Sequence, residues 1–197
     1  MSDFIDHTGD ALGESPGLTV WLTGLSGSGK TTLARLAEDA LRSRGFRVQR
    51  LDGDVLREGL NADLGFSPEH RTENVRRVGE VAALFARAGL ITFASVISPY
   101  AKDRLAARRA HDRLGVRFLE AFVDAPLDEV ERRDVKGLYA KARAGEIPEF
   151  TGISAPYEPP ASPDVHLKTA ELFETDAAQQ LVERVLAEAL SPATEAV

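Results

Sequence analysis

One short segment limits the possible folds of this chain more than any other. Residues 24–31 read Gly-Leu-Ser-Gly-Ser-Gly-Lys-Thr and match the pattern G-x-x-x-x-G-K-[ST]. Residues 19–23 before it are apolar and favour a buried strand, and leucines and alanines recur at helical spacing over residues 33–41 after it. A strand, a glycine-rich turn and a helix in this order predict a loop that binds a nucleoside triphosphate, rather than a chance glycine-rich turn.

Each part of this phosphate loop has an expected task. Its backbone N–H groups and the helix N-terminus would surround the polyphosphate, while Lys30 reaches the β- and γ-phosphates. The Thr31 hydroxyl can bind Mg²⁺. The residues expected to contact the nucleotide are Gly24, Leu25, Ser26, Gly27, Ser28, Gly29, Lys30, Thr31 and Thr32.

Beyond the loop, strand-like and helix-like segments alternate without an internal repeat. Such alternation implies right-handed crossovers and a parallel sheet with helices on both faces. We therefore expect an α/β protein with the P-loop NTPase fold and about five strands. The expected strands are 19–23, 47–51, 90–97, 116–123 and 165–168, with helices after the loop, before Gly89, over 102–114 and 127–144, and up to residue 189.

Length and charge distribution bound the domain organisation. A chain of 197 residues with 43% hydrophobic content can bury one good core, which we place at 17–190, between a loose leader (1–16) and a tail (191–197). The net charge is −7, but the acidic residues gather in 1–16 and 170–197, which leaves 17–169 at about +2 by counting. A nucleic-acid-binding protein needs a concentrated basic face, so no polynucleotide partner is expected.

Composition also bears on the compartment. The chain has no cysteine, which excludes disulfides, thiolate metal sites and cysteine nucleophiles and fits a reducing cytoplasm. The acidic N-terminus lacks the basic and apolar regions of a secretory signal, and the longest apolar run, 90–97, is too short to cross a bilayer. We expect a cytoplasmic protein without a membrane partner.

Two carboxylates follow the second expected strand directly, as Asp52-Gly53-Asp54. Ligands of parallel sheets lie beyond the carboxyl ends of the strands, where one carboxylate can orient Mg²⁺ and the other can accept a proton from a hydroxyl. An Asp/Gly turn with a helix N-cap is the alternative interpretation. The strand over 90–97 ends in Ser98-Pro99 rather than a metal-orienting aspartate, so Asp52 and Asp54 must supply the metal shell.

The late part of the chain favours one class of phosphate-loop protein. Residues 145–163 hold five prolines and two glycines, and with the segment before them they predict a lid over about 127–163. Lids exclude the water that would compete with an acceptor for the transferred phosphoryl group. The Asn-Lys-x-Asp segment with which GTPases read guanine is absent, so a small-molecule kinase is expected.

Seven segments in a fixed order resemble the adenylylsulfate kinase family, over about residues 17–190. The resemblance implies phosphorylation of adenosine 5′-phosphosulfate by ATP, with Mg²⁺, to 3′-phosphoadenosine 5′-phosphosulfate and ADP, and it implies a homodimer. The segments are Trp21–Gly27, Asp52–Arg57, Asn61–Phe66, Arg71–Asn74, Ile97–Tyr100, Lys136–Tyr139 and Phe150–Glu158.

An acceptor of this kind needs cations and an aromatic surface. Arg57 and Arg71 offer planar forks for the phosphosulfate, and Asn74 lies one helical turn after Arg71. Phe66 and Phe150 stand in loop-like surroundings and are expected to sandwich the adenine. The alternatives are a solvated helix face for the arginines and core packing for the phenylalanines.

The segment 132–143 holds five basic residues and one acidic residue, which is typical of a surface helix and also suits a cationic lid. The family resemblance implies that Lys136, Gly137 and Leu138 contact the substrate and that Arg133 lies near ATP. Ile97 is expected to line the acceptor site.

Ser98 has two possible roles. The resemblance implies a phosphoserine intermediate, whereas phosphoryl transfer in phosphate-loop kinases requires only positioning and charge stabilisation. We expect direct transfer, with Ser98 lining the acceptor site, and keep Ser98 beside Lys30, Asp52 and Asp54 as a catalytic candidate.

Two other functions stay open from the sequence alone. The first is a related P-loop kinase that acts on another nucleotide or small-metabolite hydroxyl. The second is a nucleotide-binding regulator without turnover, which the intact Lys30, Thr31, Asp52 and Asp54 disfavour.

Overall fold

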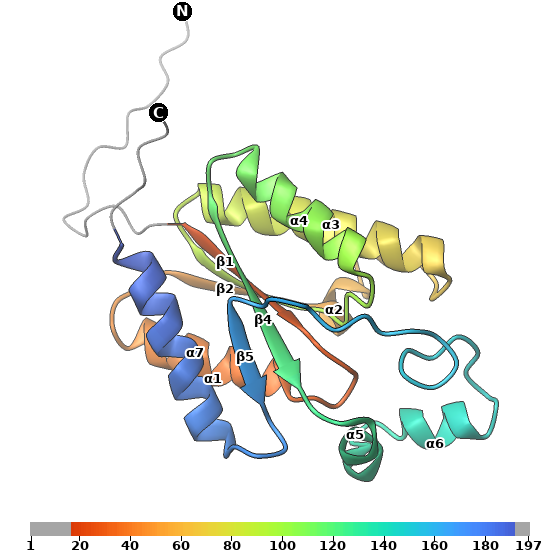
Figure 1. The fold of residues 1–197 in the computed structure, drawn as a ribbon. Helices are drawn as coiled ribbons and strands as arrows, with labels where there is room; N and C mark the ends of the chain where they lie inside the picture. The colour runs from red at the N-terminus through yellow and green to blue at the C-terminus, as the bar shows by residue number, and fades with distance from the viewer. Residues whose placement is uncertain (1–16, 192–197) are drawn as a thin grey trace, which may run out of the picture.

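The fold is built around one five-stranded sheet (Figure 1). A computed structural model describes residues 17–191, so the expected leader and all but Ser191 of the expected tail lie outside the described residues. The elements are β1 (Leu18–Thr23), α1 (Lys30–Arg42), β2 (Val48–Asp52), α2 (Gly53–Leu56), α3 (Pro68–Arg87), β3 (Ile91–Ser95), α4 (Ala101–Asp112), β4 (Arg117–Asp124), α5 (Leu127–Arg133), α6 (Leu138–Arg143), β5 (Val165–Lys168) and α7 (Glu174–Ala189).

The strand order is β2-β3-β1-β4-β5, and every pair is parallel. β1 is central and buried along its whole length, because its apolar residues face a helix layer on each side. Since β1 runs straight into the phosphate loop, that loop lies at the middle of the carboxyl edge of the sheet. The predicted fold class is confirmed.

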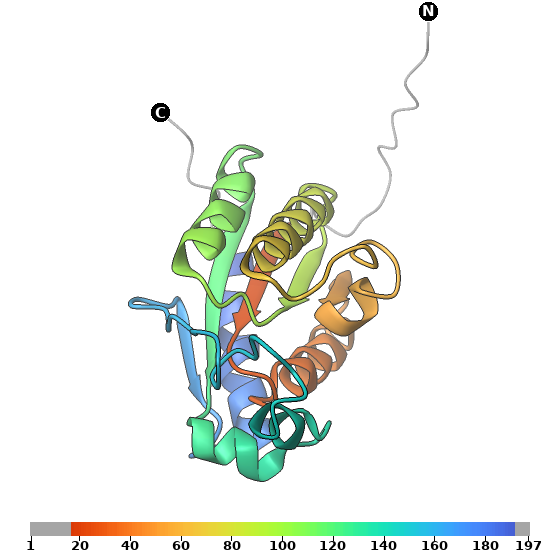
Figure 2. The ribbon, with the colours of Figure 1, turned by 90° about the vertical axis from the view of Figure 1, so that its right-hand side faces the viewer.

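Two apolar clusters hold the helices against the sheet, and Figures 1 and 2 show α1 and α7 on one face and α3 and α4 on the other. Leu33 of α1 and Leu181 of α7 pack with the β1 and β4 side chains of the first face. Val78 of α3 packs with Trp21 and Phe118 on the second face. Burial of these large side chains is the main stabilising contribution of the core.

The segment 127–163, expected to form a lid, packs in a third apolar cluster together with Ala125 and Leu25 of the phosphate loop. Val130, Tyr139 and Phe150 are buried in it. The sequence predicted one helical stretch over 127–144, and this prediction is wrong because α5 and α6 are separate helices. Asp134 and Gly137 adopt positive φ angles of 22° and 64° between them, which ends α5 before α6 begins.

Other elements also differ from the expected ones. β3 ends at Ser95, so residues 96 and 97, which were expected to belong to the strand, lie beyond its last residue. The short helix α2 was not expected, and α4 ends two residues before the predicted position 114. Within residues 17–191, no helix is both long and apolar enough to cross a membrane.

Candidate active site

A cavity of about 800 Å³ opens at the carboxyl edge of the sheet, between the phosphate loop, α2, α3 and the lid. Gly24, Leu25 and Gly137 do not line it, although the sequence interpretation placed them in contact with ligands. The predicted residues that do line it are Ser26, Gly27, Ser28, Gly29, Lys30, Thr31, Thr32, Asp52, Asp54, Arg57, Phe66, Arg71, Asn74, Ile97, Ser98, Arg133, Lys136, Leu138 and Phe150.

The phosphate loop depends on glycine at two points. A Cβ atom at Gly24 would lie 2.3 Å from the Val123 carbonyl oxygen of the neighbouring strand, so only glycine lets the loop leave β1 here. Gly29 has φ of 104° directly before α1, and no side chain of the described residues caps that helix. The first amides of α1 are therefore free for an anion.

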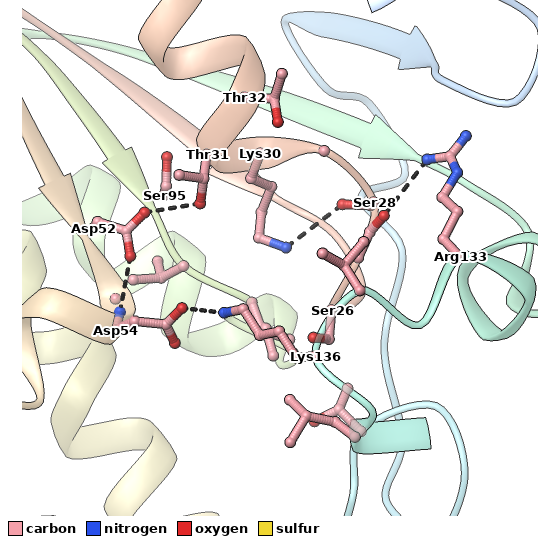
Figure 3. Close-up of a pocket in the computed structure, with 18 of the residues that line it drawn as sticks. Ser26, Ser28, Lys30, Thr31, Thr32, Asp52, Asp54, Ser95, Arg133 and Lys136 are labelled. Atoms are coloured by element: carbon pink, nitrogen blue, oxygen red, sulfur yellow. Dashed lines mark hydrogen bonds and ion pairs between the residues drawn. The ribbon is translucent and has the colours of Figure 1, made fainter. Parts of the chain in front are cut away.

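Lys30 lies folded against its own loop (Figure 3). Its Nζ donates to the carbonyl oxygens of Gly24 at 2.9 Å and Leu25 at 2.7 Å. Burial, followed by repulsion from Lys136, lowers the pKa of Lys30 to about 8, and the nearby carboxylates oppose this only in part. The carboxylates near Lys30 therefore do not offset the cost of burying its ammonium group, and a bound anion would stabilise the charged form further.

Asp52 links the phosphate loop to the second carboxylate. Its Oδ2 accepts from the Thr31 hydroxyl at 2.8 Å, and its Oδ1 accepts from the Asp54 backbone N–H at 2.9 Å. The second bond makes Asp52 the N-cap of α2, as the alternative interpretation of an Asp/Gly turn with a helix cap predicted. The cap uses Oδ1 and does not exclude a role of Asp52 at a metal. Asp54 projects into the cavity and pairs with Lys136 of the lid (Figure 3).

The oxygen atoms of Thr31 and Asp52 form a donor set suited to a hard cation such as Mg²⁺. Between residues 17 and 191 there is no group of three or more His, Cys, Asp or Glu side chains that could hold a metal by themselves. Mg²⁺ typically keeps water and shares substrate phosphates rather than sitting in an all-protein cage, so two oxygen donors beside a phosphate loop fit this ion.

At the other end of the cavity, two arginines surround Phe66. The guanidinium of Arg57 lies 4.2 Å from the ring centroid and donates to the carbonyl oxygens of Leu64 and Gly65. Arg71 donates to the carbonyl oxygens of Phe66, at 2.8 Å, and Glu149, at 2.7 Å. Burial lowers the pKa of both arginines. The arginines therefore hold the loop walls as well as lining the cavity.

The two predicted aromatic residues have different surroundings. Phe66 is 56% exposed, so core packing does not account for it. Phe150 is 8% exposed and meets Tyr139 edge-on at 5.0 Å within the third apolar cluster. Core packing thus applies to Phe150, which still lines the cavity from the lid side.

Ser98 lines the cavity while its hydroxyl group is directed into the core. Its Oγ accepts from Trp21 Nε1 at 3.0 Å and contacts the Val96 carbonyl oxygen at 3.4 Å. The residue is 2% exposed and has a positive φ of 42°, and Arg104 donates to its carbonyl oxygen at 2.9 Å. The hydroxyl is therefore engaged by β1 rather than presented to a ligand.

Several residues that line the cavity were not identified from the sequence. Ser95 ends β3 opposite Asp52 in the ladder, and Thr169 follows β5. The strand-end rule would have found Ser95 had the end of β3 been predicted correctly. Thr169 directly follows β5, whose bounds were predicted correctly, so the same rule applied there without being used. Phe173, 81% exposed before α7, had no local sequence signal beyond its residue type. Asn61 belongs to a segment of the family resemblance but was given no role, and it is buried behind the cavity wall without lining the cavity.

Arg133 and Thr169 join the lid to the phosphate loop. Arg133 Nη2 donates to the Thr169 carbonyl oxygen at 2.7 Å, and the Thr169 hydroxyl donates to the Ser28 carbonyl oxygen at 2.9 Å. With Phe173 on the same wall, these residues bring a cation and an exposed ring to the phosphate-loop end of the cavity.

Comparisons with known proteins agree on one family. The family model for adenylylsulphate kinase matches residues 16–168. An adenylyl-sulfate kinase of Penicillium chrysogenum is 54% identical over 174 residues, which cover 85% of this chain and 82% of the relative. One of Halothermothrix orenii is 54% identical over 167 residues, which cover 85% of this chain and 88% of the relative.

Solved structures lead to the same family. The Mycobacterium tuberculosis APS kinase CysC, in complex with AMPPNP and APS, superposes with a TM-score of 0.84 at 50% identity, covering 86% of this chain and 98% of that chain. A gluconokinase from Sinorhizobium meliloti, with a TM-score of 0.57 and 15% identity, shares the fold alone. The resemblance predicted from sequence is thus confirmed, and the chain belongs to the adenylylsulfate kinase family.

Proposed function

We propose that this chain transfers the γ-phosphoryl group of ATP to the ribose 3′-hydroxyl of adenosine 5′-phosphosulfate, which gives 3′-phosphoadenosine 5′-phosphosulfate and ADP. One observation supports this most directly. A single cavity has a phosphate loop at one end and two arginines around an exposed phenylalanine at the other, with Asp54 between them. The related APS kinase described in complex with AMPPNP and APS supports the same pair of ligands.

ATP would occupy the end formed by residues 24–32. The amides at the start of α1 and the Lys30 ammonium would neutralise the transferring phosphoryl group. Arg133 and the exposed ring of Phe173 would bind the remainder of the nucleotide, since a ring and a guanidinium both stack on a base. Mg²⁺ would be held by Thr31 and Asp52, with Asp54 beside them in the expected metal shell, and would supply charge stabilisation at the phosphates.

Adenosine 5′-phosphosulfate would occupy the opposite end. Arg57 and Arg71 would contact the phosphosulfate oxygens, while Phe66 stacks on the adenine. Asp54 would accept the proton of the 3′-hydroxyl, and Lys136, which pairs with Asp54 here, would move to the phosphoryl oxygens. We propose direct in-line transfer, because the Ser98 hydroxyl is engaged by Trp21.

The test is ADP release from ATP with a panel of acceptors: adenosine 5′-phosphosulfate, adenosine 5′-phosphate, other nucleotides and sugars. Turnover only with adenosine 5′-phosphosulfate, and a product phosphorylated at the 3′ position by NMR, is the expected result. Turnover with a different acceptor would support a related kinase instead. Nucleotide binding without any turnover would support a regulator.

The family resemblance further supports a homodimer, and the cysteine-free composition supports a protein that works in the cytoplasm. Size-exclusion chromatography with light scattering should give twice the mass of one chain. A monomer mass at micromolar concentration would contradict the dimer.

A further inference from the structure

A buried asparagine lies directly behind the acceptor end of the cavity. Asn61 is 0% exposed, follows α2, and is not among the residues that line the cavity. Its backbone N–H donates to the Leu56 carbonyl oxygen at 2.8 Å, which fixes the turn. Its sequence segment, Asn61–Phe66, belongs to the family resemblance, but the proposed function gives Asn61 no task.

The side-chain amide of Asn61 has one partner. Its Nδ2 donates to Asn74 Oδ1 at 2.9 Å, whereas its own Oδ1 is buried without a hydrogen-bond partner among residues 17–191. A buried carbonyl without a partner destabilises a protein, and an apolar residue of similar size would avoid this cost. The amide group is therefore retained for its effect on Asn74 rather than for stability.

That effect is to fix the direction of the Asn74 amide. Asn74 lines the cavity one turn after Arg71 and is 9% exposed. An asparagine can present either its oxygen or its NH₂ group to a ligand. Because Asn61 occupies Oδ1, the group left for the cavity is Nδ2, which has no hydrogen bond to any described residue.

We infer that Asn61 is a positioning residue that turns the Asn74 amide so that its NH₂ group faces the acceptor. This rests on the proposed function. A donor in this place suits the phosphate, sulfate and sugar oxygens of adenosine 5′-phosphosulfate, all of which accept hydrogen bonds. The opposite rotamer would aim a carbonyl oxygen at those oxygens.

Two variants of Asn61 separate orientation from packing. Asn61→Leu keeps the number and branching of the side-chain heavy atoms and removes the donor together with the unpartnered carbonyl. Asn61→Asp offers only acceptors, so Asn74 would turn its NH₂ group inward and its oxygen toward the cavity. We expect the KM for adenosine 5′-phosphosulfate to rise about three- to tenfold in Asn61→Leu and further in Asn61→Asp. The kcat and the KM for ATP should stay within about twofold, and the Tm of Asn61→Leu should equal or exceed that of the wild type.

A double variant provides the decisive comparison. If Asn61 acts through Asn74, Asn61→Leu will leave the KM unchanged in an Asn74→Leu background, because no amide remains to be oriented. A further rise in that background would show an independent structural role and overturn the inference. A wild-type KM in Asn61→Asp would show that Asn61 accepts from Asn74, which would also overturn it.

The outcome can be separated from that of the proposed function. If the wild-type protein used another acceptor of the panel and not adenosine 5′-phosphosulfate, the proposed function would fail. The same variants, measured with the acceptor that is used, would still decide whether Asn61 orients Asn74.

Discussion

The two ends of the cavity obtain their ligand-binding groups in different ways. At the donor end, the phosphate loop and Lys30 come from one run of nine residues, 24–32, which follows β1 and ends in the first turn of α1. At the acceptor end, Arg57 follows α2, Arg71 belongs to α3, and the lid supplies the carbonyl group that Arg71 holds. The phosphate-binding part of the donor end is thus a local structure, to which Arg133, Thr169 and Phe173 are added from later segments. The acceptor end exists only when three separate parts of the chain meet.

The ends also differ in what their cations contact without a ligand. Lys30 contacts carbonyl groups of its own loop, so its removal leaves other elements untouched. Arg57 and Arg71 hold the carbonyl groups of residues 64–66 and 149, so each arginine shapes a wall of the cavity as well. Substitution of Lys30 should therefore act on the chemical step, and substitutions of Arg57 and Arg71 on acceptor affinity and local order.

Lys30→Ala should have the largest effect. Loss of the ammonium removes charge stabilisation at the transferring phosphoryl group, worth ~3 kcal/mol or more, or roughly two orders of magnitude in kcat. The fold should persist, since Lys30 contacts only its own loop. Arg35→Ala on the exposed side of α1 is the matched control for steady-state kinetics. Near-normal kcat in folded Lys30→Ala would refute the donor site.

Asp54→Asn should come next, with kcat lowered by about a hundredfold or more and ATP affinity nearly unchanged. The amide has the same shape but cannot take the hydroxyl proton. Asp52→Asn should be milder, because its cap to α2 survives as an asparagine cap. Single-turnover kinetics with separate ATP titrations would distinguish the effects. A loss confined to ATP affinity would make Asp54 a binding residue.

Arg71→Ala and Arg57→Ala should each weaken adenosine 5′-phosphosulfate binding about ten- to a hundredfold, since each removes a charge-assisted contact. Adenosine 5′-phosphate, which lacks the sulfate, should lose far less affinity. Arg76→Ala, on the exposed side of α3, is the control. Equal losses for both ligands would mean that the arginines act only by holding the loops.

The affinity for ATP should fall as pH rises above 8. The pKa of Lys30 is about 8 without ligand, and bound phosphate favours the charged lysine, so binding above that pH takes up a proton. The affinity should decrease by up to about tenfold per pH unit between pH 8 and 10. Calorimetric ATP titrations of wild type and Lys30→Ala over this pH range check this, because the variant should lack the fall in affinity that comes from deprotonation of Lys30. The same slope in both proteins would assign it to another group.

Phe66→Ala should have the smallest effect, about two- to tenfold, from lost stacking. Since Phe66 would contact the adenine, adenosine 5′-phosphosulfate and adenosine 5′-phosphate should weaken alike in competition assays. Leu84→Ala, an exposed apolar residue of α3, is the control. A loss limited to adenosine 5′-phosphosulfate would remove Phe66 from the adenine site.

The difference between the two ends also explains what the sequence could predict. The phosphate loop and the five strands have local signals, and β5 was predicted with its observed bounds. The break between α5 and α6 depends on the backbone at Asp134 and Gly137, which apolar spacing does not reveal. The acceptor residues were predicted from family resemblance, because their spacing along the chain gives no geometry.

Contacts between distant segments were beyond local sequence signals. The bond that turns the Ser98 hydroxyl into the core comes from Trp21, 77 positions away. The pair between Asp54 and Lys136 spans 82 positions. The same holds for Asn61, whose importance appears only once α3 places Asn74 beside it.

The division of the cavity into two binding ends can be tested directly by calorimetry on Arg71→Ala and Arg133→Ala. Each variant is titrated with a non-hydrolysable ATP analogue and with adenosine 5′-phosphosulfate. The affinity of Arg71→Ala should fall about tenfold or more for adenosine 5′-phosphosulfate and less than about threefold for the ATP analogue. The affinities of Arg133→Ala should show the reverse pattern. If Arg71→Ala instead lost its affinity for the ATP analogue, the arginine end would belong to the donor, and the proposed arrangement of the two substrates would be wrong.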